Sequence, residues 1–311
     1  MRILFITANR VGDAVLTTGL LSWLEKTYPQ ARFTIACGPY GADLFRAVPR
    51  LDKQIILHKQ RYRLHWAALW QETVGTRWDL IVDLRNSIVS RLLWAKRRAI
   101  LKRAPGDHKV VENGKVLGLS PPPDPFIWVT PEAEQQAASL VPTDRPVLAL
   151  APAANWPLKQ WPLSSFAALV ERLIQTESLR DAVVLILADG REREQITPLL
   201  QAVPEARRIE IIGYDLQVAA ACLKRARLFV GNDSGLMHLS AATGVPTLGL
   251  FGPGFPDIYG PWGPSCAFVR TPESRDALLA TLTPETKTLM GSLTVEAVFD
   301  AACRLLTRGP A

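Results

Sequence analysis

The stretch from Val230 to Pro246 holds residues whose types and spacing could do chemistry. A short apolar run, Arg227 to Val230, predicts a buried strand, and the apolar periodicity of Leu236 to Thr243 predicts a helix. Between them stand small and polar residues that suit a turn and a helix N-cap: Gly231, Asn232, Asp233, Ser234 and Gly235. Backbone N–H groups at such a helix start lie at the positive end of the helix dipole, so this turn could bind a phosphate.

Two side chains refine this hypothesis. His238 stands about one helical turn into the predicted helix, from where it can lean back toward a bound anion. Asp233 would repel a phosphate, which favours a role as a helix cap or as a ligand for sugar hydroxyls. The alternative is that the unit binds nothing, because strand–turn–helix units occur throughout α/β proteins.

A second candidate follows the first predicted strand. Residues 2–7 form an apolar run, and residues 14–26 carry a helical apolar stripe, so Gly12 and Asp13 fall in the turn between strand and helix. Ligands bind at this carboxyl edge in open α/β folds. From position alone, Asp13 is either a helix cap or a functional carboxylate.

Two more charged residues follow strands in the second half of the chain. Lys159 lies in a loop after the predicted strand Val147 to Ala151, where it could present one mobile cation to a diphosphate or simply be solvated. The strand Ala182 to Ala188 leads to Glu192, and a carboxylate just past a strand end is a common ligand for ribose hydroxyls.

Positive charge is concentrated in the first half. The chain has a net charge of +7, and residues 1–145 hold 21 Lys and Arg against 13 Asp and Glu. One basic cluster, expected on a loop near the edge that carries Asp13, is Lys59, Arg61 and Arg63. A second cluster on or after a helix that begins near Asn86 is Arg91, Lys96, Arg97, Arg98, Lys102 and Arg103. Either cluster could clamp anionic groups of a substrate or form a solvated basic face.

The elements that position these residues repeat a βα pattern twice. Two Pro-flanked polar segments, 121–125 and 141–146, interrupt this pattern, and we predict domains of residues 1–142 and 143–311. We expect two Rossmann-like α/β domains that face each other across a cleft holding the active site. A final helix from residue 293 or 294 to about 306 could also pack back on the first domain.

Composition excludes several classes. The 311 residues are 48% hydrophobic and 21% charged, which is typical of a globular protein. No apolar run reaches the length of a membrane span, and the N-terminus resembles a core strand without a cleavage site. The four Cys show no C-x-x-C spacing, so we expect a reducing cytoplasmic compartment and no zinc site.

With these residues laid out, the chain resembles glycosyltransferase family 9, the ADP-heptose:lipopolysaccharide heptosyltransferases, over nearly its whole length. In the first half the resemblance rests on Gly12-Asp13 and on Asp79-Leu-Ile-Val-Asp-Leu84. In the second half the matching motifs are Lys159-Gln-Trp-Pro162, Gly231-Asn-Asp-Ser-Gly-x-x-His238, Gly244-Val-Pro246 and Leu250-Phe-Gly-Pro253.

The resemblance implies a GT-B enzyme that transfers heptose from ADP-heptose to the Kdo or heptose inner core of lipopolysaccharide, with inversion. Asp13 would be the general base, and Lys159, His238 and the N–H groups at Ser234 and Gly235 would stabilise the leaving diphosphate. Glu192 would bind the donor ribose and Asp233 the sugar hydroxyls. Gly12 and Asn232 would complete the donor site, and Lys59, Arg61 and Arg63 would bind the acceptor.

The resemblance implies neither a metal nor a cofactor, because the sequence has no Asp-x-Asp pair to hold a magnesium diphosphate. We expect a monomer in the cytoplasm, peripheral on the anionic inner face of the inner membrane, with no nucleic-acid partner. Two alternatives stay open: the same scaffold with a hexose or N-acetylhexosamine donor, and a non-catalytic nucleotide- or polyanion-binding protein. A nicotinamide dehydrogenase is disfavoured because Asp257 replaces the last glycine of the G-x-G-x-x-G that begins at Gly252.

Overall fold

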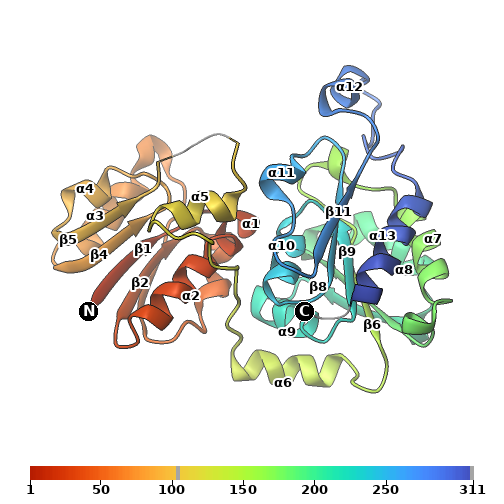
Figure 1. The fold of residues 1–311 in the computed structure, drawn as a ribbon, viewed down its shortest axis with the longest axis horizontal. Coiled ribbons are helices and arrows are strands. Elements are labelled where there is room, and N and C mark those ends of the chain that lie inside the picture. Colours follow the sequence, from red (N-terminus) through yellow and green to blue (C-terminus); the bar gives the residue numbers. More distant parts are fainter. Residues whose placement is uncertain (103–105, 309–311) are drawn as a thin grey trace. The chain divides into compact units, whose positions relative to one another are not determined.

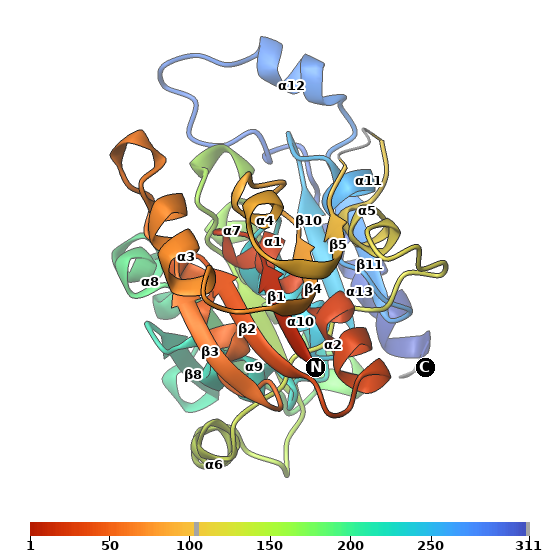
Figure 2. The ribbon, with the colours of Figure 1, turned by 90° about the vertical axis from the view of Figure 1, so that its left-hand side faces the viewer.

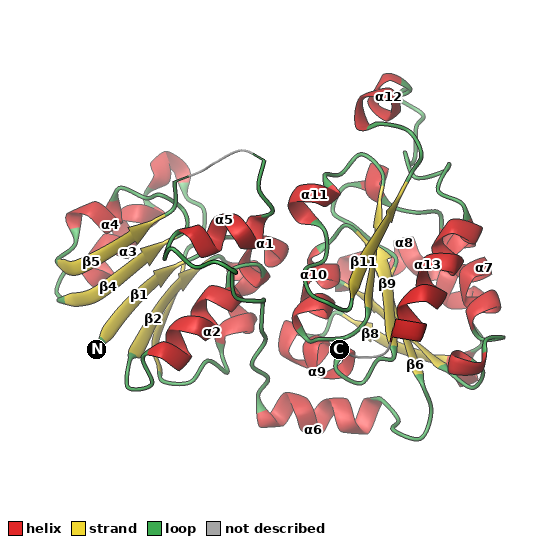
Figure 3. Cartoon of the chain, viewed as in Figure 1, coloured by secondary structure: helices red, strands yellow, loops and turns green. Residues whose placement is uncertain are grey.

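A computed structural model describes residues 1–102 and 106–308 of the chain. They form two compact units, Met1–Thr130 and Pro131–Ala311, each built around one parallel sheet (Figures 1 and 3). The two Rossmann-like sheets that the sequence predicts are therefore confirmed.

The first unit contains a five-stranded sheet of order β3-β2-β1-β4-β5. Its strands are β1 (Arg2–Ile6), β2 (Arg32–Cys37), β3 (Leu51–Ile56), β4 (Trp78–Asp83) and β5 (Ala95–Ile100). Its α-helices are α1 (Val11–Val15), α2 (Thr18–Thr27), α3 (His65–Thr73), α4 (Val89–Leu92) and α5 (Lys109–Lys115). Short 3-10 turns are η1 (Pro39–Phe45) and η2 (Arg61–Arg63).

Both faces of the first sheet are covered by helices. Alternate strand residues such as Leu4, Ile6 and Ile81 pack with Leu69 of α3 and with α4 in one apolar cluster. Helices α2 and α5 lie on the other side of the sheet (Figures 1 and 2). Coverage on both faces explains why β1 reads as a continuous apolar run, because every side chain after Arg2 is buried.

The second unit contains a six-stranded sheet of order β11-β10-β9-β6-β7-β8. Its strands are β6 (Val147–Ala151), β7 (Val183–Ala188), β8 (Arg208–Ile212), β9 (Leu228–Asn232), β10 (Thr247–Phe251) and β11 (Cys266–Arg270). Its α-helices are α6 (Pro131–Leu140), α7 (Leu163–Leu173), α8 (Arg193–Ala202), α9 (Leu216–Leu223), α10 (Gly235–Ala242), α11 (Pro256–Tyr259), α12 (Arg275–Ala280) and α13 (Val295–Arg308). The 3-10 turns are η3 (Pro157–Lys159), η4 (Glu177–Leu179), η5 (Gly190–Glu192) and η6 (Glu205–Arg207).

One large apolar core holds the second unit together. It joins strands β6, β7, β9 and β10 to helices α7, α8 and α13, with Trp161 among its largest fully buried side chains. The C-terminal helix α13 contributes Val298, Ala302 and Leu305 to this core. The opposite face carries α9 and α10, and α6 packs against α9.

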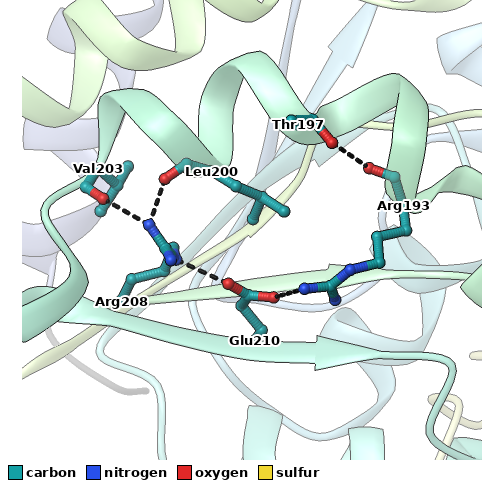
Figure 4. Close-up of polar contacts among 6 residues, drawn as sticks. All are labelled: Arg193, Thr197, Leu200, Val203, Arg208 and Glu210. Carbon is teal, nitrogen blue, oxygen red and sulfur yellow. Dashed lines mark hydrogen bonds and ion pairs between the residues drawn. The ribbon is translucent and has the colours of Figure 1, made fainter.

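A polar network fastens helix α8 to strand β8 at the sheet edge (Figure 4). The Arg208 guanidinium donates to the carbonyls of Leu200 and Val203 at the end of α8, where cations and hydrogen-bond donors satisfy unpaired carbonyls. Glu210 accepts from Arg208 (2.8 Å) and from Arg193 (2.7 Å) at the start of the helix. Both ends of α8 are thereby held against β8.

The structure differs from the sequence-based prediction at three elements. The helix predicted over residues 14–26 is two helices, α1 and α2, which meet around Leu16 and Thr17. The basic segment that contains Lys96, Arg97 and Arg98 is strand β5, and β11 was also not predicted. Both are edge strands whose residues are mostly half-buried or exposed, so they lack the apolar pattern of the central strands.

Among the described residues, no helix is both long and apolar enough to cross a bilayer. Cys37, Cys222, Cys266 and Cys303 are free thiols. Burial raises the pKa of the Cys37 and Cys222 thiols to about 11, which keeps both protonated and unreactive near neutral pH.

Candidate functional site

The second unit has the strand order 3-2-1-4-5-6 when its strands are numbered from β6. Ligands of such sheets bind where the order reverses, which here is between β6 and β9. Lys159 follows β6, and Asp233 directly follows β9. The two residues therefore reach the same point of the sheet from opposite sides.

Lys159 and Asp233 form a salt bridge through Lys159 Nζ and Asp233 Oδ2. Their side chains are 27% and 10% exposed, so the pair lies below the surface with the lysine still accessible. The expected lone cation is therefore a cation–carboxylate pair. An anion that bound Lys159 would compete with Asp233, whereas a ligand that carried both a phosphate and hydroxyl groups could satisfy both partners.

The backbone on both sides of Lys159 is held by other segments. Leu289 N–H donates to the Leu158 carbonyl (3.0 Å), and the Thr288 hydroxyl donates to the Gln160 carbonyl. Trp161 is buried, and its indole N–H donates to the Leu293 carbonyl (2.7 Å). These bonds place Lys159 on a tethered turn, η3, and do not support the mobile cation that we expected from its loop position.

Asn232 links this turn to the neighbouring strands. Its Oδ1 accepts from Trp161 N–H (3.0 Å), its Nδ2 donates to the Pro152 carbonyl (2.7 Å), and the residue is fully buried. Both ends of the amide are therefore used by backbone groups. Asn232 positions the Lys159 turn from beneath.

We predict that Asn232→Ala destabilises the second unit. The substitution leaves Trp161 N–H and the Pro152 carbonyl buried without their partner, at about 1–3 kcal/mol for each group. Equilibrium denaturant unfolding of the variant should show a loss of about that size. An unfolding free energy equal to that of the parent would contradict this role of Asn232.

The start of helix α10 contains an unsatisfied hydroxyl. Ser234 is the N-cap residue with extended backbone, yet it makes no side-chain cap, and its buried Oγ has no hydrogen-bond partner. Gly235 is the first residue of the helix, and His238 follows in the same first turn and is buried. A buried hydroxyl without a partner costs free energy, so this helix start suits a polar ligand.

The turn after β10 closes against Asp233. A Cβ atom at Gly254 would lie 2.7 Å from Asp233 Oδ2, too close for a side chain at that position. The Asp233 N–H also donates to the Leu250 carbonyl (3.1 Å). Glycine at 254 therefore lets the β10 turn pack onto the carboxylate and fix its position.

Glu192 closes a capping box at the start of η5, the 3-10 turn that leads into α8. Asp189 N–H donates to Glu192 Oε2 (2.9 Å) and Arg191 N–H donates to Asp189 Oδ1 (3.0 Å), which together form a capping box. Burial is the largest cause that raises the pKa of Glu192 above its usual value, partly offset by the bond from Asp189. One carboxylate oxygen is thus engaged in the cap.

In the first unit the strand order reverses between β1 and β4. Gly12 and Asp13 are the second and third residues of helix α1, which follows β1, and both are half-buried. The N-cap is Arg10, so Asp13 lies inside the first turn and does not occupy the cap position. Asp13 stands at the carboxyl edge of its sheet, as predicted.

Arg85 and Asn9 also lie at this point, and the sequence analysis did not identify them. Arg85 follows β4, its Nη1 donates to Asn9 Oδ1 (2.7 Å), and its guanidinium lies over the Trp66 ring at 4.8 Å. Burial lowers the pKa of Arg85 from its usual high value, although the group stays charged at neutral pH. The sequence does contain a signal for Arg85, because this residue directly follows Leu84 at the end of a predicted strand and so falls at the carboxyl edge of the sheet.

The basic clusters lie apart from this point. Lys59 and Arg61 are exposed on the segment after β3, two strands away from β1, and Arg61 stacks on Tyr62 at 4.9 Å. The side chain of Arg63 and the whole of Arg103 lie outside the described residues. Within the described part of the chain, no group of three His, Cys, Asp or Glu is arranged to hold a metal ion.

Comparison with known proteins agrees with the motifs. Residues 89–288 match the model of glycosyltransferase family 9 (heptosyltransferase). The lipopolysaccharide heptosyltransferase 2 of Salmonella typhimurium is 24% identical over 312 residues, covering 87% of this chain and 88% of that protein. The lipopolysaccharide heptosyltransferase 1 of Pseudomonas aeruginosa is 25% identical over 309 residues, covering 85% and 82%.

Solved structures show the same fold. A family 9 glycosyl transferase from Veillonella parvula superimposes with a TM-score of 0.81 at 21% identity, over 99% of this chain and 97% of that one. The ADP-heptose lipopolysaccharide heptosyltransferase II of E. coli superimposes with a TM-score of 0.76 at 21% identity, over 100% of both chains. The two sheets are therefore those of the GT-B fold.

Proposed function

We propose, from the premise that the chain belongs to glycosyltransferase family 9, the heptosyltransferases, that it transfers heptose from ADP-heptose to the inner core of lipopolysaccharide. The relatives named for lipopolysaccharide support the acceptor class. The relative named for ADP-heptose supports the donor. The reaction is inverting and needs no metal ion.

The donor binds at the switch point of the second sheet. The observation that carries this proposal is the unpartnered Ser234 hydroxyl at the start of α10, beside the residue that pairs with Lys159. A donor diphosphate accepts from Lys159 and the helix-start N–H groups, while Asp233 turns to the sugar hydroxyls. Glu192 accepts from the ribose with its second oxygen, and His238 approaches the diphosphate from the first turn of α10.

Transfer is a single displacement at the anomeric carbon. Asp13 takes the proton of the acceptor hydroxyl as its oxygen forms the new bond to that carbon. The bond from the anomeric carbon to the diphosphate oxygen breaks, and ADP leaves with the electron pair. Lys159 and the N–H groups of α10 stabilise the charge that develops on the leaving oxygen.

The acceptor binds through the first unit. Arg85 follows β4 at the same sheet edge as Asp13, bonds to Asn9, and carries a guanidinium fork that suits a carboxylate of an acidic sugar. Lys59 and Arg61, exposed after β3, extend the positive charge along the same edge, and Arg63 stays an acceptor ligand predicted from the sequence. The lipid-borne acceptor makes the enzyme peripheral on the inner face of the inner membrane.

Purified protein incubated with ADP-heptose and a Kdo-bearing lipid A acceptor should release ADP only when both substrates are present. A thermal-shift series over ADP-, UDP- and GDP-sugars should show the largest stabilisation with ADP-heptose. A larger shift with a hexose or N-acetylhexosamine nucleotide would assign another donor. Absence of transfer with every donor, together with salt-sensitive binding of any polyanion, would favour the non-catalytic alternative.

Glu192→Gln should change two quantities: the pH dependence of stability, and the affinity for the donor whose ribose Glu192 is proposed to bind. A carboxyl with a raised pKa in the folded state favours its protonated form there, so its contribution to stability is present at acid pH and is lost as pH rises through the folded pKa. The neutral amide lacks this loss, so the variant should gain stability relative to the parent as pH rises from acid toward neutral. Donor affinity should fall about tenfold or more, since bonds to a charged acceptor are the stronger ones. Unchanged affinity in donor titrations would remove Glu192 from the site.

A further inference from the structure

Three large apolar side chains form an exposed ridge on the first unit. Ile88, the N-cap of α4, and Leu92, its last residue, stand four residues apart on one face, and they are 66% and 61% exposed. Trp94 immediately precedes β5 and is 66% exposed. Val89 and Leu93 face the core instead. We call Ile88, Leu92 and Trp94 the α4 ridge.

Basic side chains surround this ridge. Leu92 and Trp94 line an open hollow of about 780 Å³, and among the described residues that line it the cations are Arg77, Arg91, Lys96 and Arg98, with Asp79 as the one carboxylate. Asp79 pairs with Lys96 (2.7 Å). Positive charge therefore exceeds negative charge around the apolar side chains.

The arginine charges are not neutralised by their partners. Arg91 donates to the Ser87 carbonyl (2.8 Å) and to Asn86 Oδ1 (2.6 Å), and Arg98 Nε donates to the Ser90 carbonyl (2.9 Å). Those acceptors are neutral. The Arg77 guanidinium lies over the Trp94 ring at 5.2 Å, which holds the indole among the cations.

The ridge runs parallel to β4, toward the carboxyl edge of the sheet. Ser87, beside Ile88, donates to the Asp83 carboxylate at the carboxyl end of β4. At the other end, Trp78 N–H at the start of β4 donates to the Trp94 carbonyl (2.9 Å). The ridge therefore spans the length of β4 and reaches the carboxyl edge of the sheet, at which Asp13 and Arg85 also lie. Figure 1 shows α4 beside β4 and β5.

We infer that the α4 ridge and its basic rim dock the enzyme on the surface of an anionic lipid bilayer. Tryptophan and aliphatic side chains enter the interfacial layer of a bilayer, while Lys and Arg around them bind anionic headgroups. A protein partner would also cover apolar groups, but excess positive charge around an exposed indole favours lipid. The inference rests on the proposed function, since a lipid-linked acceptor lies in such a surface.

Vesicle binding tests the inference without any sugar substrate. The full-length protein should cosediment with vesicles of phosphatidylglycerol and phosphatidylcholine, more weakly as salt rises, and weakly with phosphatidylcholine alone. The double variant Leu92→Ser/Trp94→Ser should lose about tenfold or more in affinity. Lys96→Gln should lose about fivefold, and only on anionic vesicles.

Two control variants remove exposed apolar groups elsewhere. Phe268→Ser on β11, with an aromatic ring that is 43% exposed, and Leu282→Ser, 48% exposed, should bind vesicles like the parent protein. Thermal unfolding should show that every variant stays folded at the temperature of the vesicle assay, since none of these side chains is fully buried. The inference is wrong if the wild-type protein does not bind anionic vesicles, which is the result expected of a surface that docks a protein. It is also wrong if the Leu92→Ser/Trp94→Ser variant binds vesicles like the parent.

The ADP-release assay separates this inference from the proposed function. With acceptor dispersed in detergent, Leu92→Ser/Trp94→Ser should turn over like the parent, and with acceptor in vesicles it should be slower. Loss of turnover in both formats would contradict a docking role. Failure of the parent to use any donor would remove the proposed function and leave the vesicle-binding result valid.

Discussion

Asp13→Asn should lower the turnover number by about two to four orders of magnitude while leaving ADP-heptose affinity unchanged, because an amide cannot take the acceptor proton. Donor affinity should persist because the proposed charged donor contacts, Lys159, Glu192 and Asp233, belong to the second unit and Asp13 to the first. Asn matches Asp in shape, so helix α1 should form as before. ADP release under single-turnover conditions and calorimetric donor titration together measure the two quantities.

A matched substitution separates the base from general loss of charge. Asp52→Asn removes another carboxylate of the first unit, one that pairs at the surface with Arg32 (3.1 Å). It should leave turnover as it is, since exposed ion pairs contribute little. If Asp13→Asn turned over like Asp52→Asn, Asp13 would not be the base, and its place in the first turn of α1 would be structural.

Lys159→Ala should lower turnover by about two to three orders of magnitude, the usual effect of removing one group that stabilises a developing negative charge. It should also weaken ADP binding, because in the proposed site the lysine contacts the diphosphate before and after transfer. The variant leaves Asp233, 10% exposed, without its cation, which destabilises the fold as well. Turnover must therefore be read beside a denaturation curve.

The double variant Lys159→Ala/Asp233→Asn resolves these two effects. Removing both charges should recover much of the lost stability, since no buried carboxylate remains unpaired, but it should not recover turnover. Lys224→Ala breaks another lysine pair of the same unit, with Glu134 (3.1 Å), and should keep full activity. Recovery of turnover in the double variant would show that Lys159 acts only by holding Asp233.

Several features were predictable from the sequence for one physical reason. Central parallel strands are buried on both faces, so β1, β6, β7, β9 and β10 read as apolar runs, and each run ends in a turn at the carboxyl edge. The residue that follows such a run is therefore placed without knowledge of the rest of the fold. This reasoning identified Asp13, Lys159 and Asp233 as edge residues.

Edge strands gave no such signal. Strand β5 carries Lys96, Arg97 and Arg98, all exposed, because only one neighbour pairs with it and water covers the rest. The α4 ridge could not be predicted from the sequence either. A helix of four residues is too short to show a periodicity, and whether Leu92 or Leu93 faces the core depends on the packing of α4.

The sequence by itself determined the family motifs and the sheet edge at which each candidate residue stands. Only the tertiary structure decided which of these residues meet. Lys159 and Asp233 are 74 positions apart, and they pair because β6 and β9 are neighbours in the sheet. Arg85 and Asn9, separated by 76 positions, meet because β4 lies beside β1. Strand order is set by packing of helices and connections over the whole sheet, and local hydrophobic periodicity carries no record of it.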